Sequence, residues 1–117
     1  WKKLEKYIGM NATDLDERYN RNSGTVGKFL KSGGGLGFDA EFAGLRNPNA
    51  GDNYFNTQAC FWTSTEFDVS NAWSRILDKD KEGIDRKIMP KNFSLSIRCV
   101  KDAEKTEAPE EEKEKED

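Results

Sequence analysis

The spacing of apolar residues divides the chain into a helical first part and a β-rich second part. In the stretch "WKKLEKYIG", Trp1, Leu4 and Ile8 recur at helical spacing, with Lys and Glu between them. Gly9 follows directly and is placed to cap the helix at its C-terminus. The pattern predicts a short amphipathic helix over residues 1–9.

Two more short helices are predicted in the first part. Asn11 can act as an N-cap, and Asp14 lies three residues later, where the acid of a capping box would lie. This second helix is expected to end near Arg18. In "TVGKFLKS", residues 25–32, apolar side chains again share one side, and the glycines that follow end the third helix.

After Gly37 the chain consists of short stretches rich in aromatic and β-branched residues, separated by turn formers, which predicts β structure. Residues 45–53 contain Pro, Gly and three Asn residues and are expected to form a loop. Residues 72–89 predict a β-hairpin with its turn at 79–83. Helices followed by an antiparallel sheet make an α+β domain.

The stretch "FSLSIRCV" shows the clearest alternation in the chain. Four residues fall on one face of the predicted strand: Phe93, Leu95, Ile97 and Cys99. We therefore expect Cys99 to point into the core and its thiol to react slowly with alkylating reagents.

Most of the negative charge lies in the C-terminal tail. Residues 103–117 hold eight acidic and three basic residues, so of the net charge of −3 for the whole chain about +2 remains for residues 1–102. We expect residues 1–102 to form one domain and residues 103–117 a disordered acidic tail. No basic cluster interleaved with aromatics indicates nucleic-acid binding, and no apolar run approaches the ~20 residues of a membrane span.

Little in the sequence points to catalysis. The chain contains no histidine, which excludes Ser/His and Cys/His nucleophiles and most catalytic metal sites within it. The glycine-rich stretches lack the strand and helix that flank a phosphate loop, and "DKDKEG" lacks the Glu that ends an EF-hand loop. We expect no metal and no cofactor. The remaining alternative for catalysis is acid catalysis by the carboxyl groups of Glu66 and Asp68.

The two cysteines, Cys60 and Cys99, leave alternatives open. Each lies among mostly apolar residues, which favours buried thiols. The alternatives are a Cys60–Cys99 disulfide, or a bond from Cys99 to a cysteine upstream of Trp1.

Five segments form a specific combination: "WKKLEKYIGM", "LKS", "GFDAEFAGLRN", "FWTSTEFDVSNAWSRIL" and "SIRCVKD". In order and spacing they resemble a bacterial family, the Fibrobacter succinogenes major paralogous domain. The resemblance implies a C-type-lectin-like fold related to the formylglycine-generating-enzyme group. It also implies an extracellular protein or outer-surface lipoprotein, and an N-terminal part of the domain that precedes Trp1.

Four residues on the predicted strands are candidate ligand contacts: Trp62, Trp73, Arg75 and Arg86. For the two tryptophans the alternative is packing in the core or on the sheet face. The resemblance implies a non-catalytic binding module for a glycan or a protein. The alternatives are a relative of the formylglycine-generating enzymes, which use a close cysteine pair, and a purely structural domain for surface assembly.

Overall fold

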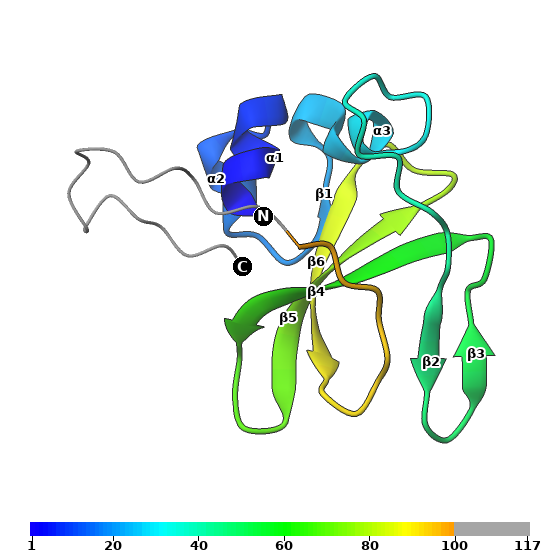
Figure 1. Ribbon diagram of the computed structural model, residues 1–117. Coiled ribbons are helices and arrows are strands. Elements are labelled where there is room, and N and C mark those ends of the chain that lie inside the picture. Colours follow the sequence, from blue (N-terminus) through cyan, green and yellow to red (C-terminus); the bar gives the residue numbers. More distant parts are fainter. Residues whose placement is uncertain (100–117) are drawn as a thin grey trace.

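Three short helices lie within the first 30 residues, and all but one strand of an antiparallel sheet follow them, as the change of hydrophobic period predicts (Figure 1). The computed structural model describes residues 1–99, so the predicted tail at 103–117 lies outside the described residues. The helices are α1 (Lys2–Ile8), α2 (Ala12–Leu15) and α3 (Val26–Leu30), and a 3-10 turn, Ser23–Thr25, leads into α3. None of the helices in the described residues is long and apolar enough to cross a membrane.

Four strands form the main sheet in the order β1-β6-β5-β4, and all neighbouring strands are antiparallel. They are β1 (Tyr19–Arg21), β4 (Gln58–Glu66), β5 (Asn71–Asp78) and β6 (Ile84–Pro90). A separate two-stranded hairpin consists of β2 (Leu45–Asn47) and β3 (Gly51–Asn53). The α+β prediction is confirmed, and so is the β5–β6 hairpin with its turn at 79–83.

The helix ends follow the predicted caps in part. Gly9 ends α1 with a φ of 140°, which a glycine adopts without strain. The Asn11 side chain accepts a hydrogen bond of 2.9 Å from the Asp14 backbone N–H, as an N-cap should. The reciprocal bond of a capping box is absent, because the Asp14 carboxylate accepts from the backbone of Ser23 instead.

Each face of the main sheet packs against a different part of the chain. The helices cover one face, and the buried members of its core are Met10, Val26, Leu30, Ala40, Ala59, Phe61, Leu77 and Ile84. The opposite face has a smaller core of Leu45, Cys60 and Ile76, with Met89, Phe93 and Leu95 packed against it. Alternate residues of a strand point to opposite faces, so Phe61 and Cys60 belong to different cores.

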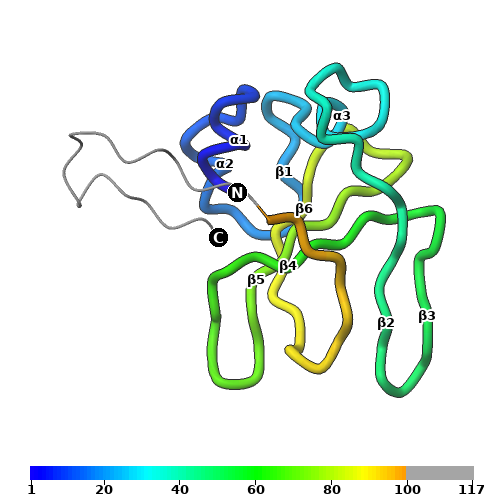
Figure 2. The backbone as a smooth tube through the Cα atoms, in the orientation of Figure 1, coloured from blue at the N-terminus to red at the C-terminus, as the bar shows by residue number. Residues whose placement is uncertain are grey.

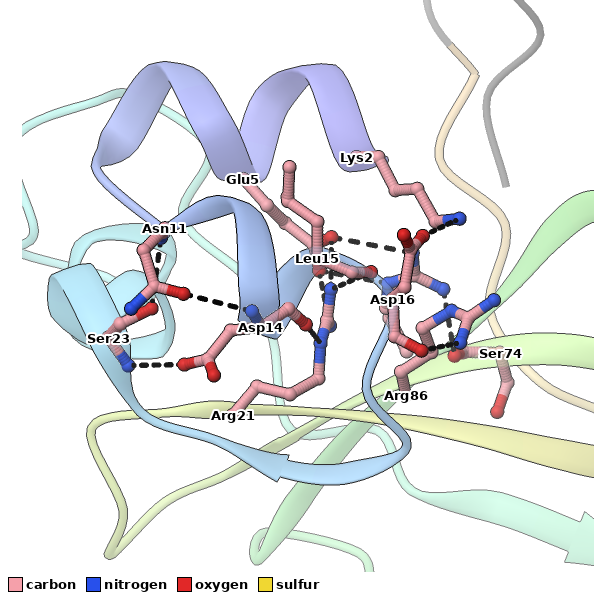
Figure 3. A network of polar contacts seen from close by, with 11 residues as sticks. Lys2, Glu5, Asn11, Asp14, Leu15, Asp16, Arg21, Ser23, Ser74 and Arg86 are labelled. Carbon is pink, nitrogen blue, oxygen red and sulfur yellow. Dashed lines mark hydrogen bonds and ion pairs between the residues drawn. The ribbon is translucent and has the colours of Figure 1, made fainter.

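A buried charge cluster joins α1 to the sheet (Figure 3). The Glu5 carboxylate accepts hydrogen bonds of 2.8 and 2.7 Å from the Arg21 guanidinium. From the other side it accepts one of 2.9 Å from Nε of Arg75. All three side chains are completely buried. We call Glu5, Arg21 and Arg75 the buried triad.

Arg21 also determines where α2 ends. Its Nε donates to the carbonyl of Asp14 at 2.8 Å, and its Nη2 donates to the carbonyl of Leu15 at 3.2 Å. These are carbonyls that a helix end leaves without partners. The predicted extension of α2 to Arg18 is wrong, because the chain leaves the helix at Leu15 to form β1.

The segment after β6 differs from the predicted strand. It joins the β2–β3 hairpin to the main sheet through two isolated bridges, Arg46 with Ser94 and Phe61 with Ser96. In Figure 2 this segment, in orange, runs between the β2–β3 hairpin and the main sheet. The predicted face is correct for Phe93 and Leu95, which pack on the smaller core.

The same face prediction is wrong for Ile97 and Cys99. Both side chains are exposed, Ile97 by 70%. No bridge in the described residues extends beyond Ser96, so nothing holds the alternation of the strand there. Cys99 therefore does not point into the core.

The predicted loop at 45–53 is instead the β2–β3 hairpin, with a turn at 48–50. Poor strand formers pair here because a tight turn brings them together and Ser94 bonds to the outer side of β2. The base of the hairpin is closely packed. Gly44 has a φ of 71°, and a Cβ added to it would lie 2.2 Å from the carbonyl oxygen of Asn53.

We expect the substitution Glu5→Gln to destabilise the protein by about 3–5 kcal/mol, because it removes the buried carboxylate charge that two guanidinium groups share. Urea denaturation of the variant and the parent would measure the loss. Glu17→Gln removes an exposed carboxylate and should change the free energy of unfolding by less than about 0.5 kcal/mol. Equal stability of the two variants would contradict the role given to the buried triad.

Candidate functional site

Trp73 and Arg86 meet on the helix-covered face of the main sheet. The Arg86 guanidinium lies 3.7 Å from the centroid of the Trp73 ring, and its Nη1 donates a hydrogen bond of 2.9 Å to the carbonyl of Asp16. Phe67 meets the Trp73 ring edge-on, with centroids 5.6 Å apart. Trp73 is 8% exposed and Arg86 7%. The sequence left ligand contact and packing open for Trp73, and this buried position supports packing.

Arg75 does not reach the surface. In the register of the sheet it lies directly opposite Arg86, where two like charges repel. Glu5 offsets that repulsion, because it binds Arg75 within the buried triad. Since Arg75 is completely buried, its position supports a structural role and not the expected ligand contact.

Trp62 pairs with Ser74 in the register of β4 and β5, and it lines an aromatic pocket. This pocket has a volume of about 480 Å³, and its apolar lining includes Trp1, Leu4, Phe38 and Ile97. Arg98 covers the Phe38 ring, with its guanidinium 3.9 Å from the ring centroid. The aromatic pocket includes Trp1 and Cys99, the first and last described residues.

A second pocket opens between the β2–β3 hairpin and the face of the main sheet opposite the helices. We call it the hairpin pocket; its volume is about 400 Å³, and it is lined by Leu45, Asn47, Ala50, Asn53, Tyr54, Gln58, Ile76, Lys87, Met89 and Phe93. Leu45 and Ile76 are buried and belong to the smaller core, so they form an apolar floor. Three amide side chains, one ammonium group and the exposed Tyr54 ring surround it.

The residues of the hairpin pocket were not among the sequence candidates. They come from five separate strands, the residues that follow β2 and β3, and the segment after β6, and only the folded chain brings them together. One signal was present in the sequence. Asn and Pro cluster at 47–53, and exposed polar loops held by a rigid scaffold commonly carry binding residues.

Cys60 and Cys99 are both free thiols in separate environments. Burial raises the pKa of Cys60 to about 12, and the positive charge of Lys87 opposes part of this rise. Cys60 is therefore uncharged and unreactive near neutral pH, because the thiolate is the nucleophile. Within residues 1–99, no three acidic or thiol side chains gather closely enough to hold a metal ion.

Comparison with known proteins gives one match. The family model of the Fibrobacter succinogenes major domain matches residues 1–101. The search of curated proteins and the search of solved structures found no significant match.

We expect alkylation of the native protein near pH 8 to add one label, at Cys99, and a second at Cys60 only after denaturation. Cys99 is exposed, whereas Cys60 is buried and has a pKa of about 12. Mass spectrometry of the intact protein and of its peptides would count and place the labels. Cys99→Ser should take no label when native; rapid labelling of Cys60 would contradict the packing of the smaller core.

Proposed function

The chain belongs to the Fibrobacter succinogenes major domain family, and from this premise we propose that it is a non-catalytic module that binds a glycan through the hairpin pocket. The family resemblance also supports a place at the bacterial cell surface or outside the cell. The proposal rests on one observation above all, which is the lining of the hairpin pocket.

That lining matches the two kinds of surface that a sugar presents. A pyranose ring has apolar C–H faces, which pack on aromatic rings such as those of Tyr54 and Phe93. Its hydroxyl groups both donate and accept hydrogen bonds, and an amide side chain offers both functions in one group. An apolar floor with a few polar groups around it is the usual design of a small-ligand site.

The same lining supports binding without catalysis. Hydrolysis of a glycosidic bond generally uses two carboxyl groups that flank the bond, and the described residues of the hairpin pocket include no carboxylate. The enzyme alternative requires a reactive cysteine pair. Cys60 is buried with a pKa of about 12, which supports a structural role for this thiol.

The test is to screen the protein on a glycan array and to repeat the positive sugars with Tyr54→Ala. We expect the variant to bind about tenfold more weakly, because a stacked ring contributes roughly 1 kcal/mol or more. Tyr7→Ala is the matched control. Tyr7 is also an exposed tyrosine, but it lies on α1 and not in the hairpin pocket.

Two results would overturn the proposal. One is the absence of glycan binding by the folded protein, which would favour a structural role in surface assembly. The other is an equal loss of binding in the Tyr54 and Tyr7 variants. Circular dichroism of each variant would separate loss of the site from loss of the fold.

A further inference from the structure

We propose that Lys87 makes the hairpin pocket selective for an acidic sugar, one that carries a carboxylate on its ring, as uronic acids do. The inference rests on the proposed glycan binding and adds the charge of the ligand. It is carried by the placement of one cation in a pocket that otherwise contains neutral groups.

Lys87 is the only charged residue among the described residues that line the hairpin pocket. It lies on β6 opposite Ser74, whose hydroxyl donates a hydrogen bond of 2.9 Å to the Lys87 carbonyl and so fixes its backbone. The side chain is half-buried. Within residues 1–99, its ammonium group forms neither an ion pair nor a hydrogen bond, although Asp85 lies two residues away on the same strand face.

Other lysines of the domain are placed differently. Three lysines form ion pairs with acidic side chains: Lys2 with Asp16, Lys28 with Glu82 and Lys91 with Glu66. Lys31 donates to the backbone carbonyls of Lys79 and Lys81 in the β5–β6 turn. Lys87 instead combines partial burial with the absence of a partner among residues 1–99, and a cation withdrawn from water favours an anionic ligand.

The charge of Lys87 also acts on the floor of the hairpin pocket. It opposes the effect of burial on the pKa of Cys60, which belongs to the smaller core beneath the pocket. A carboxylate of a ligand that binds beside Lys87 would be attracted by the same charge. No acidic side chain among the described lining residues would repel it.

A sugar acid suits this arrangement better than a free phosphate. One ammonium group balances the single charge of a carboxylate, whereas phosphate binding typically uses several charged donors or a fork of arginine donors. The buried Leu45 and Ile76 and the ring of Phe93 provide apolar surface that an inorganic anion cannot use. A uronic acid offers both an apolar ring face and a carboxylate at its edge.

The experiment compares methyl glucuronide with methyl glucoside, and methyl galacturonide with methyl galactoside, by NMR titration of the full chain. We expect at least one acidic sugar to bind about tenfold more tightly than its neutral counterpart in dilute salt. Lys87→Gln should abolish this preference, so that the acidic sugar and its neutral counterpart bind the variant with equal affinity. Lys87→Arg should retain the preference, since it keeps the charge.

Lys6→Gln is the matched control, because it removes one exposed positive charge from α1. It should leave the preference intact, and added salt should weaken the preference in the parent protein. Equal binding of acidic and neutral sugars, or a preference that survives Lys87→Gln, would overturn the role of Lys87 while glycan binding stands. The absence of binding at the hairpin pocket by all four sugars would overturn the acidic-sugar proposal, whereas the glycan array decides whether the proposed glycan binding stands.

Discussion

The fold depends on the enclosure of one carboxylate, that of Glu5, by two guanidinium groups. The three members of the buried triad come from α1, β1 and β5, and Arg75 lies 70 residues from Glu5 in the chain. Charges removed from water are stable only while all their partners are in place. The docking of helix α1 and the pairing of β1, β6 and β5 therefore stabilise each other, which couples the two parts of the chain.

Two arginines on the helix-covered face of the main sheet are held by internal contacts. Arginine donors occupy the last carbonyls of α2 and the residue after it, and Arg86 covers the Trp73 ring. The polar groups on the helix side thus serve internal contacts. On the opposite face the cover is a thin hairpin held by the segment after β6, and the hairpin pocket remains open between them.

Local features of the fold could be predicted from the sequence, whereas features that depend on distant partners could not. The Gly9 cap, the Asn11 cap and the β5–β6 turn follow from short-range patterns. Glu5 appears as one of the solvent-facing residues of an amphipathic helix until Arg21 and Arg75 are placed beside it. Trp73 and Arg86 have side chains that suit ligand contact and packing equally, so the sequence alone does not separate the two roles. The hairpin pocket has no contiguous sequence, so no single motif could reveal it.

The base of the β2–β3 hairpin leaves no room for a Cβ at Gly44, whereas its turn at 48–50 is exposed. Substitutions are therefore tolerated differently at the base and at the turn of the hairpin. Substitutions at the turn can reshape one wall of the hairpin pocket without moving the strands that support it, but a side chain at the base would displace that entire wall. A library that randomises residues 48–50 would therefore vary the shape of the hairpin pocket at little cost in stability.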